Sequence, residues 1–374
     1  MKSCLKIPSN KHWTAAPQAQ LEVQQTILRV LANGNFTLGS EVESFEREFS
    51  AFSGVPGLGV GSGTDAITLA LTVGGIGPGD EVLLPTFAPA GTIAGVLCSG
   101  ATPVLVDITS DFELDLKMAE QSITKNTRAV VCVHLFGRME NMWGINQLAN
   151  LFNLWVVEDC AHAHGAMLLE PGTQTWWPAG SIGDAAAFSF YPTKNLGACG
   201  DAGFCGSKHT ELLPRLAALR QYGWTRRDHA EILGRNSRLD EIQAGILRVG
   251  LRSLLERNHR RRANASIYHK LLHGFSAHHC TLPPQTDPAR ILVFHQYVLQ
   301  SDRRDALISH LQNHGIGYGI HYPPLHTQPA FRRYGGERAF AAADDLGRRV
   351  VSLPMFPELS NTEIEIVCET LNTF

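Results

Sequence analysis

Over about residues 58–207, short apolar segments alternate along the chain with longer segments in which apolar and polar residues are mixed. Short runs of β-branched and other apolar residues predict strands, and the longer segments between them have the spacing of helices. The predicted strands are GLGV, EVLLP, TPVLVDI, RAVVCVHLF, LWVVEDC, AAAFSF and AGFCGS. Because these runs are apolar throughout rather than at every second residue, they predict a largely parallel sheet covered by helices on both faces.

The architecture changes towards the C-terminus. Helical patterns cover residues 64–74, 88–100, 114–123, 141–152 and 211–223, and one long pattern covers residues 237–272. A strand at 291–300, a helix at 303–315 and a closing helix after Ser360 follow. We therefore expect a large α/β domain with a seven-stranded sheet over residues 1–250 and a small α+β domain over residues 251–374. Residues 170–184 mix glycine, proline and tryptophan without a period, which predicts a mobile loop.

Composition narrows the class of protein. The chain has 374 residues, 44% hydrophobic and 18% charged, with a net charge of −3, so it can bury a large core. The balanced charge indicates neither a nucleic-acid partner nor a membrane surface. The N-terminus lacks the apolar core of a signal peptide and no run is long enough to span a membrane, which predicts a cytoplasmic protein. The eight cysteines lack CxxC spacing and are expected to be free thiols.

Candidate chemistry follows the predicted strands, because ligands of open parallel sheets bind at the carboxyl ends of the strands. GSGTD (residues 61–65) comes directly after GLGV and opens a helix, where free backbone N–H groups would hold a phosphate. A simple turn with a Ser or Thr cap is the alternative. The dinucleotide fingerprint fails, because Thr64 replaces its third glycine and Asp80 precedes the next strand.

A second group of polar residues follows LWVV. Glu158 and Asp159 come at the strand end, where a carboxylate in apolar surroundings needs a cationic or hydrogen-bonding partner, although a helix cap is the alternative. His162 and His164 have a spacing that could bind a metal, and HGFSAHHC at 273–280 resembles a metal tract. No cysteine or carboxylate set completes a coordination shell around the pair, so we predict no metal.

Lys194 is the third candidate. It follows the strand AAAFSF and precedes Gly197, Gly200 and Gly203. Most lysines lie on the surface, but one in a partly desolvated pocket has a lowered pKa and can form a Schiff base with a carbonyl. A phosphate cradle, a strand-end carboxylate and such a lysine are together what pyridoxal 5′-phosphate requires.

From about residue 12 to the C-terminus, the chain resembles the DegT family of sugar-nucleotide aminotransferases, which have the aspartate-aminotransferase fold, fold type I of pyridoxal-phosphate enzymes. The motifs that carry the resemblance are VGSGTDAITLAL, VVEDCAHAHGA, GSIGDAAAFSFYPTKNLGACGDAGF, GRNSRLDEIQAGILRV and IHYPPLHTQPAF. The resemblance implies that the cofactor is pyridoxal phosphate, present as pyridoxamine phosphate during turnover.

The resemblance also implies roles for single residues. Lys194 would bind the cofactor covalently and carry protons, and Asp159 would pair with the pyridine nitrogen. The phosphate contacts would come from Ser62, Gly63, Thr64 and Ser189, and from Asn236 of the partner subunit. A shared site of this kind implies an obligate homodimer. A cap on the helix that follows is the alternative role of Asn236.

Two positions depart from the family pattern. Where the family often has an aromatic residue stacked on the cofactor ring, this chain has Pro89, so either Pro89 covers the ring or Phe87 shifts to do so. His162 replaces a usual glutamine. It would bond the phenolic oxygen of the cofactor and titrate near neutral pH. The residues expected to line the substrate pocket are Tyr191, Asn195, His321, Tyr322 and His326.

The implied reaction moves an amino group from L-glutamate to a keto group, at C3 or C4, of a nucleotide-linked keto-deoxysugar. The product would enter a surface glycan, such as a lipopolysaccharide O-antigen, or a glycosylated metabolite. Lys194 favours transamination over the dehydration that a histidine at this position implies. The alternatives are a pyridoxal-phosphate sensor without turnover, or another fold-type-I enzyme such as a sulfur-handling lyase. The sequence leaves the nucleotide open among dTDP, UDP and GDP.

Overall fold

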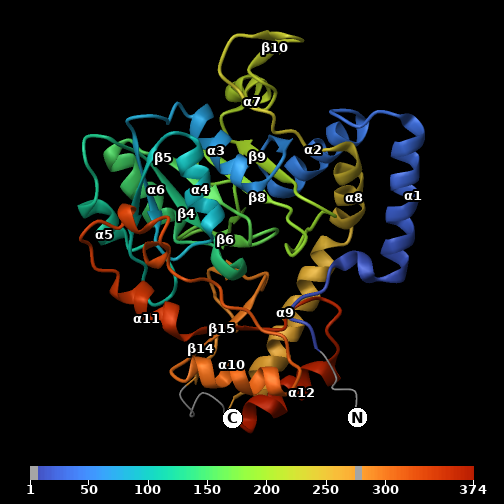
Figure 1. The fold of residues 1–374 in the computed structure, drawn as a ribbon, viewed down its shortest axis with the longest axis vertical. Coiled ribbons are helices and arrows are strands. Elements are labelled where there is room, and N and C mark those ends of the chain that lie inside the picture. The colour runs from blue at the N-terminus through green and yellow to red at the C-terminus, as the bar shows by residue number, and fades with distance from the viewer. Residues whose placement is uncertain (1–6, 274–279) are drawn as a thin grey trace.

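A seven-stranded sheet forms the centre of the molecule (Figure 1). The computed structural model describes residues 7–273 and 280–374. The strand order is β1-β9-β8-β5-β4-β2-β3, and only β9 runs antiparallel to its neighbours β1 and β8. This confirms the predicted mostly parallel sheet, and each of its strands overlaps one of the seven apolar runs. Its strands are β1 (Gly57–Val60), β2 (Glu81–Pro85), β3 (Thr102–Val106), β4 (Thr127–Val133), β5 (Trp155–Asp159), β8 (Ala185–Ser189) and β9 (Gly203–Ser207).

Helices cover both faces of this sheet, as the apolar runs predict. Successive side chains of a strand point to opposite faces, so Leu83 of β2 packs into one core while Val82 and Leu84 pack into the other. The first face is covered by α2 (Ser40–Ser53), α5 (Leu116–Gln121), α6 (Met142–Phe152) and α8 (Glu241–Leu251). The second is covered by α3 (Gly63–Val73), α4 (Ala90–Cys98) and α7 (Leu213–Leu219). Helix α1 (Pro17–Asn33) packs on α8.

The C-terminal part has a separate core. Helix α9 (Leu254–Leu271) leads away from the large sheet to three antiparallel strands, β12 (Cys280–Thr281), β14 (Tyr297–Ser301) and β15 (Val350–Leu353) (Figure 1). These pack with α10 (Arg304–Asn313) and α12 (Asn361–Asn372) around fully buried Tyr268 and Tyr297. Ile7 joins this core, whereas α11 (Ala341–Arg349) returns to the large sheet. The division at residues 250/251 stays a prediction.

Three expected elements differ from the structure. The predicted helix 237–272 starts only at Glu241 and is broken at Arg252–Ser253. There Arg257 Nη2 donates to the carbonyl of Gly250 at 2.8 Å, and the Ser253 N–H donates to the same carbonyl at 3.3 Å. Residues 170–184 contain β7 (Trp176–Pro178), which pairs with β6 (Met167–Leu169), which in turn pairs with β13 (Arg290–Ile291). The predicted strand 291–300 is split between β13 and β14. The pairing of β13 with β6 joins segments far apart in the sequence, which local patterns do not contain.

A two-stranded hairpin stands out from the molecule beside α7 (Figure 1). It consists of β10 (Trp224–Arg226) and β11 (His229–Ala230), and Leu233 at its base is 97% exposed. Within residues 7–273 and 280–374, no helix combines the length and apolarity needed to cross a membrane.

Candidate active site

The predicted phosphate cradle lies at the start of α3. Ser62 caps this helix, because its hydroxyl accepts the Asp65 N–H at 3.1 Å. The N–H groups of Gly63 and Thr64 belong to the first turn, where they have no acceptor within the helix. A Cβ added to Gly63 would lie 2.5 Å from Cβ of Ser189, so the start of α3 directly adjoins the end of β8. The two predicted phosphate-binding segments therefore meet.

Asp159 lies at the end of β5 and is 4% exposed. Its carboxylate accepts the Thr92 hydroxyl at 2.7 Å and the Ala161 N–H at 3.1 Å. Burial nevertheless raises the pKa of Asp159, although these bonds and nearby Lys194 act to lower it. The negative charge is thus only partly compensated, and a protonated ring nitrogen would compensate it. Thr92 carries no signal in the sequence, because its role depends on how α4 packs against β5.

Lys194 lies in the turn after β8, where its N–H donates to the Tyr191 carbonyl at 2.8 Å. Burial lowers the pKa of its amine to about 8, and the Asp159 charge acts in the opposite direction. An amine with this pKa is partly unprotonated near neutral pH and can attack a carbonyl. The predicted lysine and carboxylate are therefore close enough to influence each other's ionisation.

His162 is buried and both of its ring nitrogens have partners. The Phe136 N–H donates to Nδ1 at 3.3 Å, which leaves the proton of the neutral ring on Nε2, 3.1 Å from Oη of Tyr322. The ring packs against His295 with centroids 4.4 Å apart. Burial lowers the pKa of His162 well below its usual value, so the expected titration near neutral pH is wrong. A bond to the cofactor's phenolic oxygen would require an exchange of one of these partners.

Asn195 is buried, and both the nitrogen and the oxygen of its side-chain amide are bonded within the protein. Its amide nitrogen donates to Oδ1 of Asn258 at 3.0 Å and to the Val293 carbonyl at 3.2 Å. Its oxygen lies 3.0 Å from Nδ1 of His295. The expected substrate contact is therefore replaced by a positioning role. His295 occurs in the HQYV segment, but nothing in the sequence indicates that it packs on His162.

The other residues predicted to line the substrate pocket make different contacts. Tyr322 reaches His162, whereas His321 bonds Oγ of Ser352 at 2.8 Å, and burial lowers the pKa of His321 to about 4. His326 is held between Oγ1 of Thr86 at 2.7 Å and Oδ1 of Asp344 at 3.0 Å, so it ties the end of β2 to α11. Tyr191 is 52% exposed.

The two candidates for covering the cofactor ring differ in burial. Phe87 is fully buried in the core and packs against Phe112 with ring centroids 5.4 Å apart. Pro89 is half-buried at the N-cap position directly before α4. Phe87 would have to leave the core to reach a ligand, so the geometry favours Pro89.

Asn236 is exposed and pairs with Gln221 in an isolated bridge. The cap position of α8 belongs to Asp240, so the alternative role of Asn236 as a helix cap is wrong.

The residues on either side of Asn236 face the cradle of their own chain. Arg235 Nη1 lies 3.4 Å from Oδ1 of Asp65, and Oγ of Ser237 accepts the Gly61 N–H at 3.0 Å. Asn236 itself is exposed between these two residues.

The His162–His164 pair does not form a metal site. His164 is fully buried among Phe49, Phe188 and Phe190, and its ring nitrogens have no partner within the described residues. Burial lowers the pKa of His164 to about 3. Residues 274–279 of the second histidine-rich tract lie outside the described residues.

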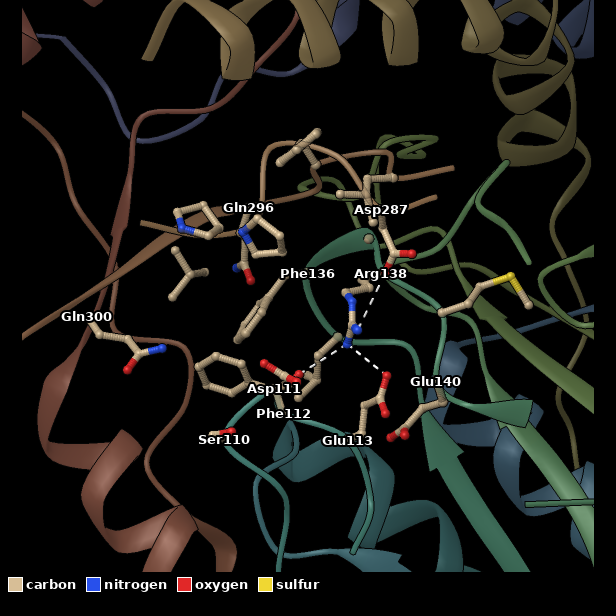
Figure 2. A pocket seen from close by; sticks show the side chains of 18 of the residues that line it. Ser110, Asp111, Phe112, Glu113, Phe136, Arg138, Glu140, Asp287, Gln296 and Gln300 are labelled. Atoms are coloured by element: carbon tan, nitrogen blue, oxygen red, sulfur yellow. Dashed lines mark hydrogen bonds and ion pairs between the residues drawn. The ribbon is translucent and has the colours of Figure 1, made fainter. Parts of the chain in front are cut away.

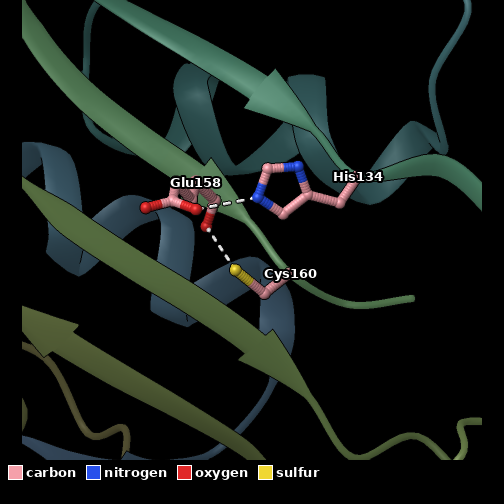
Figure 3. Close-up of side chains that lie close together, drawn as sticks. All are labelled: His134, Glu158 and Cys160. Atoms are coloured by element: carbon pink, nitrogen blue, oxygen red, sulfur yellow. Dashed lines mark hydrogen bonds and ion pairs between the residues drawn. The ribbon is translucent and has the colours of Figure 1, made fainter. Parts of the chain in front are cut away.

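A different set, His134, Glu158 and Cys160, brings potential metal ligands together (Figure 3). Both carboxylate oxygens of Glu158 are already used. Oε2 binds His134 Nε2 at 2.8 Å and the Gly180 N–H at 2.8 Å, and Oε1 accepts the N–H groups of Ile182 and Gly183. This cluster ties residues 180–183 to the sheet.

The cradle, the undercompensated carboxylate and the amine with a lowered pKa fit the phosphate, ring nitrogen and aldehyde of pyridoxal phosphate. Fold and site thus define a pyridoxal-phosphate enzyme of fold type I. The DegT/DnrJ/EryC1/StrS aminotransferase family model matches residues 17–372, and the chain belongs to this family. It is an aminotransferase.

Two characterised relatives act on nucleotide sugars. The chain is 41% identical over 346 residues to a UDP-N-acetyl-3-dehydro-alpha-D-glucosamine 3-aminotransferase of Acidithiobacillus ferrooxidans, covering 92% of this chain and 91% of the relative. It is also 41% identical over 359 residues to a dTDP-3-amino-3,4,6-trideoxy-alpha-D-glucose transaminase of Streptomyces venezuelae, covering 93% and 91%.

Solved structures support the same class. DesV of S. venezuelae, in complex with a ketimine intermediate, superposes with a TM-score of 0.91 at 39% identity and 98% coverage of both chains. NtdA of Bacillus subtilis with bound pyridoxamine phosphate superposes with a TM-score of 0.87 at 28% identity, covering 96% of this chain and 82% of NtdA.

The lowered pKa of Lys194 predicts a pH dependence in the cofactor-free enzyme. Trapping of a small aldehyde by borohydride reduction should increase with pH and reach half its maximum near pH 8, because only the unprotonated amine reacts. Asp159→Asn should move this midpoint below that of the wild type, since Asp159 stabilises the charged amine. Peptide mass spectrometry would quantify the labelling, with exposed Lys117 as an internal reference. A midpoint near 10 would contradict the assignment.

The neutral state of His162 leads to a second prediction. His162→Gln should leave the shape of the pH profile of kcat/KM unchanged between about pH 6 and 8, because neither side chain ionises there. The rate itself should fall about fivefold, as expected for the loss of one hydrogen bond of about 1 kcal/mol. If the variant lost an ionisation that the wild type has in this range, His162 would be titrating after all.

Proposed function

We propose that this enzyme transfers an amino group from L-glutamate to a 3-keto group of a nucleotide-linked keto-deoxysugar. The observation that carries the proposal is the Lys194–Asp159 pair beside the α3 cradle, which fits the cofactor of transamination. The names of both relatives refer to nitrogen at C3 and to UDP or dTDP sugars, which favours C3 over C4 and these nucleotides over GDP.

Each residue has a distinct part in this reaction. Bound pyridoxal phosphate supplies an electron sink for the pair left when the Cα–H bond of the donor breaks. Lys194 Nζ, with a pKa of about 8, accepts that proton and returns a proton to the neighbouring carbon. Asp159 compensates the positive ring nitrogen, and Thr92 fixes the carboxylate through the 2.7 Å bond. One water supplies the keto oxygen with which L-glutamate leaves as 2-oxoglutarate. The retained amino group then replaces the keto oxygen of the sugar, which leaves as water, so the two halves of the reaction consume no net water.

We further propose a homodimer in which Asn236 completes the phosphate site of the partner. Asn236 is exposed, while Arg235 and Ser237 on either side of it contact the cradle of their own chain. The β10–β11 hairpin nearby along the chain stands out from the molecule (Figure 1). The amino sugar would then serve a surface glycan such as an O-antigen, or a glycosylated metabolite.

The first test is the absorption spectrum of the purified enzyme before and after L-glutamate. The band of the lysine-bound cofactor should disappear in the wild type, with pyridoxamine phosphate and 2-oxoglutarate formed, but not in Lys194→Ala. The loaded enzyme should then aminate UDP- or dTDP-linked 3-keto sugars, with NMR to locate the nitrogen. A cofactor band that no amino donor changes would favour a sensor, and release of sulfide from cysteine would favour a lyase.

Mixed dimers test the shared site. Asn236→Asp should weaken cofactor binding at least about tenfold, because the new charge repels the phosphate. Random mixing with Lys194→Ala should restore about a quarter of wild-type activity, because half of the dimers contain one complete site. Absence of any recovery after verified subunit exchange would place Asn236 and Lys194 in the same site of one chain.

A further inference from the structure

A second cavity, of about 320 Å³, lies apart from Lys194 (Figure 2). Its walls come from the segments after β3 and β4 and from residues on either side of β13, within 110–113, 133–140 and 281–300. None of the residues assigned to the cofactor lines it. Its size is in the range of a small aromatic or aliphatic ring compound.

Three phenylalanines of the wall have an unusual backbone. Phe112, Phe136 and Phe294 have φ values of 64°, 60° and 41°. Bulky side chains rarely adopt this left-handed region, and such conformations cluster at functional sites, where the surroundings hold them. The rings of Phe112 and Phe136 meet edge to face with centroids 5.1 Å apart. The fold thus maintains costly conformations to place aromatic surface at this cavity.

Polar groups in the same wall lack partners. Glu140 is 3% exposed, and its Oε1 has no hydrogen-bond partner within the described residues, whereas Oε2 accepts the Leu114 N–H at 3.0 Å. Oε1 of Gln296 and Nε of Arg138 are also buried without a partner there. Burial raises the pKa of Glu140 to about 8, so at neutral pH it is mostly a neutral acid that can donate a hydrogen bond.

The charges at the cavity disfavour an ionic ligand. Arg138 is already bound to Glu113 at 2.9 Å and to Asp287 at 3.6 Å, as Figure 2 shows. An anion would meet these carboxylates and that of Asp111. A cation would find Glu113 and Asp287 already paired with arginines, because Arg290 binds both of them as well. The remaining carboxylate, Asp111, is exposed. The unpaired donors and acceptors instead suit an uncharged molecule with an apolar ring and a hydroxyl or amide group.

The wall also contacts the active site. The N–H of Phe136 donates to Nδ1 of His162, and the N–H of Gln296 lies 3.4 Å from the Phe136 carbonyl. His295, between Phe294 and Gln296, packs on the His162 ring. A molecule that moves either wall segment would therefore change the position of His162.

We propose that this cavity binds a small uncharged ring compound bearing a hydroxyl or amide group, and that its occupancy regulates the Lys194 site through Phe136 and His162. The regulatory part rests on the proposed role of His162 beside Lys194. The binding part is independent of the proposed reaction.

Ligand-observed NMR titrations of the holoenzyme test the binding part. Phenol and benzamide should bind saturably and at least about tenfold more tightly than benzoate and benzylamine, because the buried part of the wall offers a charged group no counter-ion that is not already paired. Leu282 is half-buried in the cavity wall, so the larger side chain of Leu282→Trp should occupy part of the cavity and weaken the binding of benzamide at least about tenfold. Leu255→Trp is the matched control outside the cavity and should bind benzamide like the wild type.

The proposed site would be overturned if benzamide showed no saturable binding, or if benzoate bound equally well. It would also be overturned if Leu282→Trp, with intact circular dichroism and cofactor content, bound benzamide like the wild type. Saturating benzamide should also shift the cofactor absorption band and change the KM for the amino donor at least twofold, and neither effect should occur in Leu282→Trp. Binding without either effect would overturn the regulation alone. The NMR titrations and the absorption measurement need no nucleotide sugar and no turnover, so a failure of the proposed transamination would leave their outcome unaffected.

Discussion

The buried carboxylate of Asp159 is the interaction on which the rest of the site depends. Strand β5 delivers two consecutive carboxylates to opposite faces of the sheet, and their surroundings treat them differently. Glu158 receives three N–H groups and His134, and these outweigh burial, so the pKa of Glu158 falls below its usual value. Asp159 receives only two donors, and burial keeps its pKa raised. The charge of Glu158 is therefore compensated within the protein, whereas that of Asp159 is compensated only in part and would be stabilised by a further positive charge.

The partly compensated charge of Asp159 also sets the state of Lys194. Burial lowers the pKa of the lysine and the Asp159 charge partly restores it, which leaves the amine with a pKa of about 8. A cation on the cofactor ring would compensate Asp159 and weaken its hold on the proton of Lys194. In the proposed site, cofactor binding and activation of Lys194 would therefore be coupled through one carboxylate.

The sequence predicts features that local pattern or strand-end position determines, and not those that distant contacts create. The seven apolar runs and the GSGTD start of α3 are local, so both are confirmed. The split of the predicted strand 291–300 depends on the pairing of β13 with β6, which lies more remote in the chain. Thr92 and His295 gain their roles only when α4 and residues 293–296 reach the carboxyl ends of the strands. The pKa of His162 depends on burial, which the HxH pattern does not encode.

The segment 235–237 shows how one stretch of chain can serve two sites. Ser237 and Arg235 contact the cradle of their own chain through Gly61 and Asp65, while Asn236 between them is exposed. In the proposed dimer, the side chains that stiffen one cradle would alternate with the side chain that completes the other. A shift of this segment would then alter both phosphate sites together, so the order of each cradle would depend on subunit pairing.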